Sequence, residues 1–380
     1  MEGTNMLFAL DAMGGDYAPA EPCKGAILAC NDNPELEVAL VGLEEQIKPH
    51  LDAADGSTLS RIHVVPASEV IGMGDNPAAS IRTKKNSSMR IAMEMVRSKE
   101  AVGCISAGNT GAIVSGGVLV VGRIRGIDRP GLAVPLPSLE RVSLLLDVGA
   151  TVRCKALNLY QFAHMGSIYM SSLSGIVAPS VSLLSNGSED IKGDEACSEA
   201  REMLQRSALN FKGYIEGKDV PIGKTDVVVC DGYTGNALIK FGEGIGEVVE
   251  SLVREELRGS FVSKIGAMLM LPALKRIMAK FEYEKNGGSP LLGVDGIVIK
   301  AHGNSKGKAI AGALKVGLGF AKLKGTELIK ESFDPGGIDP EVWIDVSLGE
   351  TGGILLAAIG GRPVGIMGTG MKIQIGRAHV

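Results

Sequence analysis

Aromatic side chains are scarce in this chain. They make up 4% of its 380 residues and include a single tryptophan, so few surfaces exist on which nucleic-acid bases could stack. The formal net charge of −4 also lacks the positive excess with which proteins neutralise phosphate backbones. We therefore expect no nucleic-acid partner.

The cysteines lack any CxxC spacing, and several lie inside apolar runs. Neither a zinc site nor a disulfide framework is indicated, so we predict no metal site and expect reduced thiols in a cytoplasmic protein. No signal peptide is recognised, and no uninterrupted apolar stretch reaches the ~20 residues that span a bilayer. The cysteines are Cys23, Cys30, Cys104, Cys154, Cys197 and Cys230.

Familiar catalytic sets are missing as well. The five histidines are scattered, and among them only His302 stands at a predicted strand end. No GxGxxG follows the first predicted strand, and the stretch GNSKGKAI at 303–310 lacks the spacing of a P-loop. The absence of a nucleophile with a matching base favours a reaction in which a bound anion attacks directly.

The composition that is present belongs to a soluble globular protein. Hydrophobic residues make up 45% and charged residues 22%, an ordinary balance for such proteins. The 52 glycines form no low-complexity tract, which indicates many tight turns. The length allows one large domain or two modest ones.

Short apolar runs alternate with helical patterns, which is the signature of parallel βαβ units. The runs are apolar throughout, as expected where helices cover both faces of a sheet. We predict an α/β fold with a mostly parallel sheet. The predicted strands are 8–10, 38–41, 62–65, 103–106, 143–146, 181–184, 227–230 and 297–299, and the predicted helices include 88–97, 157–170, 195–207, 235–258 and 306–323.

Six of the predicted strands end in a polar loop that carries glycine. Ligands of open α/β sheets bind at the carboxyl ends of the strands, so we expect the loops to converge on one edge as a site. Each loop taken alone could equally be a plain turn. The loops are 11–16, 106–111, 147–151, 185–187, 231–236 and 302–305.

Two stretches, the glycine-bearing loop at 11–16 and the basic stretch at 80–92, suggest how the protein could bind an anion. Gly14 and Gly15 let the backbone approach a ligand closely, whereas Asp11 and Asp16 are expected to hold cations or the first turns in place. The stretch SIRTKKNSSMRIA at 80–92 combines basic groups and hydroxyls before a helix, which fits a phosphate grip. A solvated loop with a serine N-cap is the alternative, and this stretch alone favours it. The residues of the predicted grip are Lys84, Lys85, Ser87 and Ser88.

Further candidates for substrate binding stand at later strand ends. Ser106, Asn109 and Thr110 lead from a strand into a helix, where side-chain donors and free amides suit an oxyanion. Asp231 is the second residue of a similar stretch, CDGYTGN at 230–236, and we include it, together with His302, among the candidates.

Six ordered motifs resemble those of the bacterial fatty acyl-acyl carrier protein:phosphate acyltransferases. They are ALDAMGGDYAP, KKNSSM, SAGNTGA, LLLDVGA, DVVVCDGYTGN and GGSPLLGVDGIVIKAHGNS, between about residue 6 and about residue 325. The resemblance implies transfer of a long acyl chain from acyl carrier protein to inorganic phosphate, without a cofactor. The acyl phosphate would feed a membrane glycerol phosphate acyltransferase at the start of phospholipid synthesis.

The resemblance also implies a fold and a catalytic pair. The fold would be a three-layer sandwich like that of isopropylmalate dehydrogenase and phosphotransacetylase, assembled as a homodimer. Lys192 and Asn236 match the family's catalytic lysine and asparagine motifs and would orient phosphate and stabilise the developing oxyanion. Asp194 and Thr151 each replace an asparagine that is usual in the family, which puts the fine geometry in question.

We expect residues 1–330 to form the acyltransferase domain, with a protruding helical hairpin at about 250–285. The likeness ends near residue 325, and RPVGIMGTGM at 362–371 looks like the opening of a different enzyme, a β-ketoacyl carrier-protein synthase. We therefore interpret residues 331–380 as an atypical tail from a fusion or a mis-assembled end.

The segment 258–281 carries five cations and no acid between 258 and 280, with many apolar residues. We expect its tip to lie reversibly on an anionic membrane, as basic amphipathic helices do. A helical hairpin in a dimer interface is the alternative. The predicted membrane contacts are Met268, Leu269, Met270 and Leu271.

Two other functions remain open at this point. An NAD-linked isopropylmalate-type dehydrogenase would need a pair of acidic residues that bind a divalent metal and a nucleotide-binding loop. Neither motif is recognised in the sequence. A non-catalytic adaptor for acyl carrier protein or membrane would need no reacting groups at all. Phosphate-dependent loss of the carrier thioester separates these functions from the acyltransferase.

Overall fold

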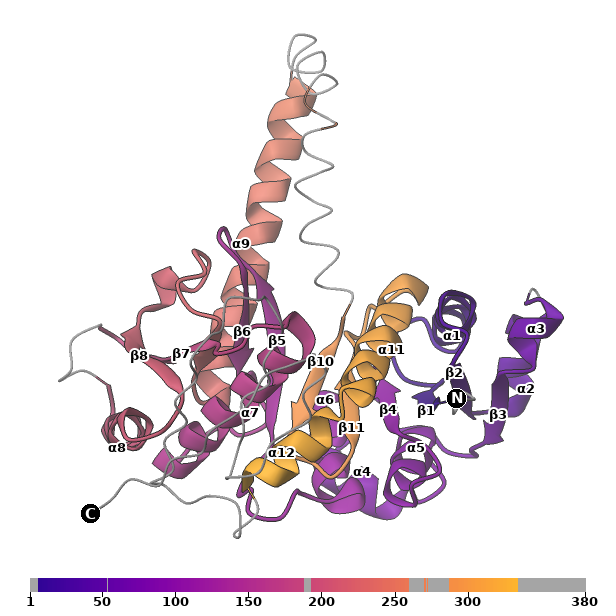
Figure 1. Ribbon diagram of the computed structural model, residues 1–380. Helices are drawn as coiled ribbons and strands as arrows, with labels where there is room; N and C mark the ends of the chain where they lie inside the picture. Colours follow the sequence, from indigo (N-terminus) through magenta and orange to yellow (C-terminus); the bar gives the residue numbers. More distant parts are fainter. Residues whose placement is uncertain are drawn as a thin grey trace, which may run out of the picture.

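The computed structural model describes residues 6–52, 54–187, 193–259, 270, 272 and 287–333 (Figure 1). The strands found in these residues form one sheet in the order β3-β2-β1-β4-β11-β10-β5-β6-β9-β7-β8. They are β1 Met6–Asp11, β2 Leu36–Gly42, β3 Ile62–Pro66, β4 Gly103–Ser106, β5 Gly131–Pro137, β6 Val142–Leu146, β7 Ser180–Leu184, β8 Asn210–Ile215, β9 Val227–Val229, β10 Ser289–Leu292 and β11 Ile297–Lys300.

The helices cover both faces of this sheet, as the apolar strands predict. They are α1 Ala20–Asp32, α2 Glu44–Ile47, α3 Gly56–Leu59, α4 Pro77–Thr83, α5 Ser88–Arg97, α6 Thr110–Gly116, α7 Ala156–Ser174, α8 Glu195–Gln205, α9 Gly232–Gly259, α11 Gly307–Lys322 and α12 Gly325–Phe333, with short turns η1 Lys48–His50, η2 Gly117–Val121 and η3 Gly217–Asp219. The predicted strands and helices are confirmed to within a few residues, but β5, β8 and β10 were not predicted.

Alternate residues of each central strand enter two separate cores. In β4, Ile105 packs with Phe8 and Leu10 in the core that α1, α7 and α11 cover. Its neighbour Cys104 packs on the other face, in the core that contains Met93 of α5. Leu238 and Ile239 of α9 pack against this second core, so α9 lies on the same face of the sheet as α5 and α6.

The sheet reverses direction in its middle. Strands β1, β2, β3, β4 and β11 are parallel, and β6, β7, β8 and β9 are parallel to one another. Three successive antiparallel pairings, β11 with β10, β10 with β5 and β5 with β6, separate the two groups. An odd number of reversals makes the groups run in opposite directions.

This reversal corrects the prediction that six loops converge on one edge. Loops 11–16, 106–111 and 302–305 follow strands of the first group and lie at one edge. Loops 147–151, 185–187 and 231–236 follow strands of the second group and lie at the opposite edge. Any site that uses both sets therefore needs an element that connects the two edges.

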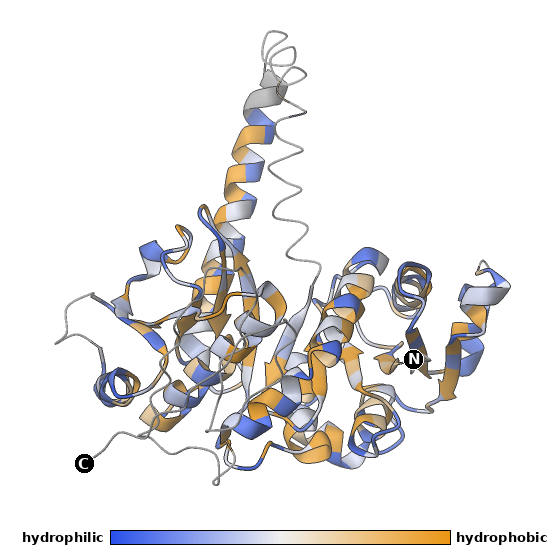
Figure 2. Ribbon diagram, viewed as in Figure 1, coloured by the Kyte–Doolittle hydropathy of each residue, from blue (hydrophilic) through white to orange (hydrophobic). Residues whose placement is uncertain are grey.

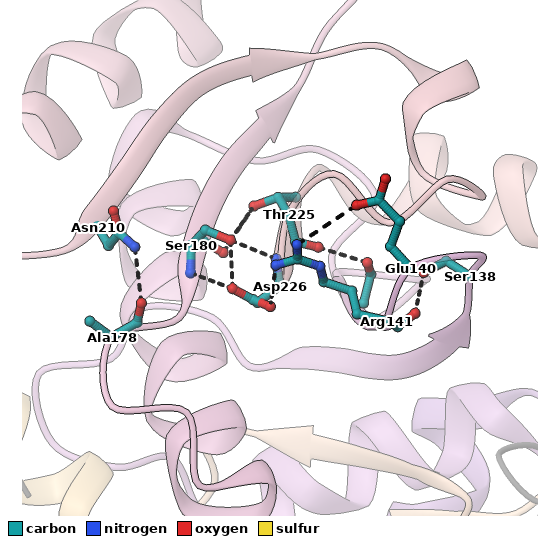
Figure 3. A network of polar contacts seen from close by, with 9 residues as sticks. Ser138, Glu140, Arg141, Ala178, Ser180, Asn210, Thr225 and Asp226 are labelled. Atoms are coloured by element: carbon teal, nitrogen blue, oxygen red, sulfur yellow. Dashed lines mark hydrogen bonds and ion pairs between the residues drawn. The ribbon is translucent and has the colours of Figure 1, made fainter.

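A polar network joins the amino ends of β6, β7 and β9 (Figure 3); Ser180, Thr225 and Asp226 are buried in it, whereas Arg141 is exposed. The Arg141 Nη1 lies 3.0 Å from Asp226 Oδ1, and the Ser180 amide donates to Asp226 Oδ2 over 2.7 Å. Burial alone would raise the pKa of Asp226, but the hydrogen bonds from Ser180 and the charge of Arg141 lower it below its ordinary value. Thr225 Oγ1 adds a bond to the Ser180 carbonyl.

Helix α9 rises out of the body of the protein and projects beyond it (Figure 1). Figure 2 shows hydrophobic residues recurring along the projecting part. Exposed apolar side chains on α9 are Phe241, Ile245, Val248, Val249, Leu252 and Val253. Within the described residues, no helix combines the length and the apolar character needed to cross a bilayer.

The predicted hairpin at 250–285 is described only in part. Its first residues continue α9, and Met270 is 57% exposed. The predicted contacts Met268, Leu269 and Leu271 lie outside the described residues.

The predicted domain end at 330 falls within α12, which continues to Phe333. Ser332 and Phe333 are buried, and Phe333 belongs to the core that α7 covers. The folded unit therefore includes at least three residues that we had assigned to the tail.

Candidate active site

Asp11 ends β1 and is 2% exposed. Its carboxylate accepts hydrogen bonds from the hydroxyls of Ser88 and Ser106, each over 2.6 Å, and from the Met13 amide over 3.2 Å. Burial raises the pKa of Asp11, and these hydrogen bonds offset part of that effect. Asp11 thus holds α5 and β4 to the first loop, and its partners among the described residues are hydroxyls and amides rather than the cations that we had allowed for.

The glycines of the first loop permit close contact between strand ends. A Cβ on Gly14 would lie 2.7 Å from Asp11 Oδ2 and 2.9 Å from the Gly108 amide nitrogen. Gly15 has a φ of +100°, and the next amide, of Asp16, donates to the Gly303 carbonyl over 2.8 Å. The close approach is therefore to the neighbouring loops of the protein itself.

The basic stretch before α5 is tied to its surroundings. Lys84 Nζ lies 2.6 Å from Asp75 Oδ2 and 2.8 Å from the Val70 carbonyl. Ser87 is buried at the N-cap position of α5 and donates to the Lys84 carbonyl, whereas Lys85 is exposed. Lys84 and Ser87 are thus engaged within the protein, and the Ser87 side chain makes no capping bond to α5, so the structure bears out neither the four-residue phosphate grip nor the loop with a serine N-cap.

Asn109 caps α6, because its Oδ1 accepts from the Ala112 amide over 3.1 Å. Its Nδ2 donates to the carbonyls of Gly72, Met73 and Asp75. The side-chain donors of Asn109 therefore hold the loop before α4, and half-buried Thr110 begins the helix.

Asp147 is the counterpart of Asp11 at the opposite edge and is fully buried. Its carboxylate accepts from four backbone amides: Leu132 over 2.8 Å, Gly149 over 3.1 Å, Ala150 over 3.0 Å and Thr151 over 2.6 Å. Burial raises its pKa, and the amide bonds counteract the rise. Since Thr151 binds through its amide, an asparagine at this position could make the same bond.

The start of α9 packs directly on this loop. A Cβ on Gly232 would lie 2.6 Å from Asp147 Oδ2. Asp231 caps the helix, accepting from the amides of Tyr233 and Thr234 over 2.9 Å each. Its carboxylate thus occupies the helix start, where we had predicted a substrate contact.

Of the two predicted catalytic residues, only Asn236 lies in the part of the chain that the structure describes. Asn236 is exposed one turn into α9, beside the Asp147 loop: a Cβ on Gly149 would lie 3.9 Å from the Asn236 Cβ. Lys192 lies outside the described residues. Asp194, which follows it closely, caps α8 by accepting from the Cys197 amide over 2.8 Å.

A cationic cluster that we had not predicted stands at the end of β11. Lys300 is half-buried, and its charged neighbours are Lys240 and Glu243 of α9. Partial burial and the charge of Lys300 lower the pKa of exposed His302. A lysine that ends an otherwise apolar strand is the one signal in the sequence that could have indicated this cluster.

Helix α9 is the element that connects the two edges. It starts at the Asp147 loop with Asp231, and by Lys240 and Glu243 it has reached Lys300 and His302 at the end of β11. Asn236 and Lys240 are four residues apart and so share a face of the helix. Helix α9 thus links the second-edge residues Asp231 and Asn236 to Lys300 and His302 of the first edge. The other predicted residues of the first edge are Gly14, Gly15, Ser88, Ser106, Asn109 and Thr110.

Metal ligation has no obvious place among the described residues: no group of three His, Cys, Asp or Glu side chains there is arranged to hold an ion.

The sequence matches the profile of a family described as "Fatty acid synthesis protein" over residues 6–327. A phosphate acyltransferase of Heliobacterium modesticaldum is 45% identical over 335 residues, covering 88% of this chain and 99% of that protein. A phosphate acyltransferase of Caldanaerobacter subterraneus is 46% identical over 310 residues, covering 82% of this chain and 92% of that protein.

Solved structures confirm the predicted fold. A phosphotransacetylase from Streptococcus pyogenes superposes with a TM-score of 0.57 at 14% identity, covering 86% of this chain and 95% of that one. The EutD phosphotransacetylase from Staphylococcus aureus gives 0.55 at 13% identity, covering 84% and 95%. The fold alone follows from these two structures, whereas the identity along nearly the whole length of the relatives decides the family. This chain belongs to the phosphate acyltransferases, within the family of fatty acid synthesis proteins.

Proposed function

We propose that this chain transfers a long-chain fatty acyl group from the thioester of acyl carrier protein to inorganic phosphate, and that the acyl phosphate serves phospholipid synthesis. The observation that carries the proposal is 45% identity along 99% of a phosphate acyltransferase. The name of that relative supports acyl transfer to phosphate. The carrier-protein donor and the lipid destination rest on the motif resemblance.

The chemistry requires no protein nucleophile. A phosphate oxygen attacks the thioester carbonyl carbon, and the carbonyl oxygen takes the negative charge. The intermediate then collapses, the carbon–sulfur bond breaks, and the leaving thiolate takes up the proton that the attacking hydrogen phosphate releases. The protein has to hold phosphate, exclude competing water and stabilise the oxyanion.

The pKa values of the cysteines agree with a reaction that uses no protein nucleophile. Burial raises the pKa of Cys23 and Cys30 to about 11, and that of Cys104, Cys154 and Cys197 to about 12. Burial also raises the pKa of Cys230 well above its ordinary value. All of these thiols stay protonated at neutral pH, so none is activated for acyl transfer.

Within the proposed reaction, Asn236 and Lys192 form the catalytic pair. Asn236 is exposed beside the Asp147 loop, where its amide could donate to the oxyanion. Phosphate would be held by the cations toward the end of β11.

The exposed face of α9 supports a homodimer. Phe241, Ile245, Val248 and Leu252 recur at spacings of four, three and four, the pattern with which two helices pair. Such a stripe is unfavourable in water, and an identical stripe on a second copy would cover it. Analytical ultracentrifugation tests this: Val248→Glu should yield monomers, whereas glutamate at the isolated exposed position Leu139 should not.

We also propose that the protein attaches reversibly to anionic membrane. This attachment would deliver the acyl phosphate to a membrane glycerol phosphate acyltransferase. Exposed Met270 is the described member of the predicted tip. Co-sedimentation with anionic vesicles should weaken in salt and disappear when Met268, Leu269 and Leu271 become glutamate. Unchanged binding, or a mutant that falls to monomer, would assign the segment to the dimer interface instead.

The decisive experiment follows the acyl-carrier thioester and the acyl phosphate together. Loss of thioester should require phosphate and proceed without NAD or added metal, and EDTA should not abolish it. A strict need for NAD would indicate the dehydrogenase, and binding without turnover would indicate the adaptor. Asn236→Ala should lower turnover by about 10²–10³ without unfolding the protein, whereas Asn210→Ala, whose Nδ2 binds the Ala178 carbonyl, serves as control.

A further inference from the structure

A row of polar side chains crosses three neighbouring strands at their carboxyl ends. Lys300 of β11 is in register with Ser106 of β4, and the Ser106 hydroxyl donates to Asp11 of β1. Residues in register on parallel strands point to the same face, and the residues two positions earlier, Cys104 and Val298, pack in the core beneath α5 and α6. The Lys300 side chain therefore stands on the face where α9 passes.

The Lys300 side chain has no hydrogen bond or ion pair with any residue that the structure describes. Its charged neighbours are Lys240 and Glu243, and its own charge, after the larger effect of burial, lowers the pKa of His302. Of these, Lys240 pairs with Glu243 at 2.7 Å, so the one nearby carboxylate already has a cation of its own. Burial and then the charge of Lys240 lower the pKa of Lys300, and the charge of Glu243 offsets only part of this effect.

A half-buried cation that is paired with none of the described residues is unfavourable, and an anion that binds beside it would remove that cost. Helix α9 places such an anion close to the reaction. Asn236, Lys240 and Glu243 share one face of the helix, and Asn236 and Lys240 are about 6 Å apart along its axis, since each residue adds about 1.5 Å. The cation cluster and the proposed oxyanion donor are thus neighbours.

We propose that Lys300 is the cation that binds the inorganic phosphate which attacks the thioester, with Lys240 and His302 at its side. This inference rests on the proposed function and adds the nucleophile's position to it. The other phosphoryl group available to a carrier-protein reaction is the phosphodiester of the donor's prosthetic arm. The position beside Asn236 favours the nucleophile, which has to reach the carbonyl itself.

Phosphate binding without an acyl donor gives the first test. We would titrate inorganic phosphate into the full-length protein by calorimetry, using Lys300→Met, Lys300→Gln and Lys300→Arg, with exposed Lys315→Met of α11 as the matched control. Removing the charge should weaken phosphate binding roughly 10- to 100-fold, as expected for a lost charge-assisted hydrogen bond. Lys300→Arg should restore most of the affinity, and Lys315→Met should change nothing.

Wild-type affinity in both uncharged variants would overturn the proposal. Unfolding curves identify a variant that has lost its fold, and in that event the Arg and Gln variants decide, because both keep a polar head group. The calorimetric titration uses inorganic phosphate alone, so its result is valid whether or not the protein makes acyl phosphate.

Steady-state kinetics give the second test and separate the two phosphoryl groups. In Lys300→Gln the KM for phosphate should rise roughly 10- to 100-fold while the KM for the acyl donor stays within about twofold. A rise confined to the KM of the donor would assign Lys300 to the prosthetic arm and overturn the proposal. Wild-type protein that binds phosphate through Lys300 but forms no acyl phosphate would refute the proposed function and leave this site standing.

Discussion

The two halves of the sheet each bury one aspartate at the end of a central strand, but they satisfy it by different means. Asp11 accepts from the hydroxyls of Ser88 and Ser106, residues that are distant in sequence. Asp147 accepts from four backbone amides, three of them in its own loop and one from Leu132. Burial raises the pKa of both carboxyls.

The difference determines what each carboxylate does for the protein. Hydroxyls can rotate and can either donate or accept, so the Asp11 cluster is adaptable and depends on side chains. Amides are fixed and only donate, so the Asp147 loop is a rigid nest that exists only around an anionic acceptor. The rigid loop supports the start of α9 and thus the position of Asn236.

The largest effect should come from removing the carboxylates altogether. Asp147→Ala leaves four amides without an acceptor, those of buried Leu132 and Thr151 and of half-buried Gly149 and Ala150. Because each buried amide left unpaired costs about 1–3 kcal/mol, we expect the free energy of unfolding to fall by about 4 kcal/mol. Asp11→Ala should cost about 2 kcal/mol, because its hydroxyl partners can turn to other acceptors. Urea denaturation of both variants measures the difference, and an equal loss would contradict the distinction between rigid and adaptable partners.

Asparagine substitutions sharpen the same comparison. In Asp11→Asn the new NH₂ group can donate to a hydroxyl that has rotated, so we expect a loss within about 1 kcal/mol. In the wild type, Asp147 Oδ2 accepts a hydrogen bond from the Thr151 amide. In Asp147→Asn, an NH₂ group at this position would place a donor against that amide, which is also a donor. Two donors in contact should cost about 2 kcal/mol more than in the Asp11 variant. A reversed order in the unfolding curves would show that the Asp147 loop can rearrange.

The strands show how far sequence reasoning reaches in this protein. The central ones were predictable because they are short, uninterrupted apolar runs that alternate with helices. Strands β5 and β10 were missed because Pro135, Pro137 and Pro290 interrupt their patterns, and proline within a run argues against a strand. These two strands make the antiparallel pairings, so missing them also placed six loops at one edge.

The candidate site was harder to predict for a related reason. Side chains that bind anions at helix starts are of the same types as those that cap helices, so Asp231 and Asn109 could not be assigned to one role without their partners. Lys300 was missed because its neighbours Lys240 and Glu243 come from a helix distant in sequence. Only the path of α9 brings them together.

The raised pKa of Asp11 predicts the direction in which the free energy of unfolding changes with pH. The folded protein binds the Asp11 proton more tightly than the unfolded chain, so stability is lost as pH rises from the ordinary carboxyl pKa of 3.8 through the raised folded value. Asp11→Asn removes this titration. The stability of the wild type relative to this variant should therefore fall across that interval, by at most about 1.4 kcal/mol per pH unit.

Asp226 provides the opposite sign as a control, because its pKa is lowered in the folded state. The wild type should lose stability relative to Asp226→Asn as pH falls through that lowered value. If both comparisons had the same sign, the burial of Asp11 would not be its dominant influence.

Removing single hydroxyl groups distinguishes the two clusters most directly, and the Thr151 hydroxyl should give the smallest effect of all. Ser106→Ala removes a donor from Asp11 and the acceptor of the Gly108 amide, so we expect a loss of about 2 kcal/mol and a further rise in the pKa of Asp11. Thr151→Ala removes only the bond from its hydroxyl to the Pro130 carbonyl, because its amide still binds Asp147. We expect a loss of about 0.5 kcal/mol. A Thr151→Ala loss as large as that of Ser106→Ala would mean that the Asp147 loop also depends on side chains, and the contrast between the two edges would no longer hold.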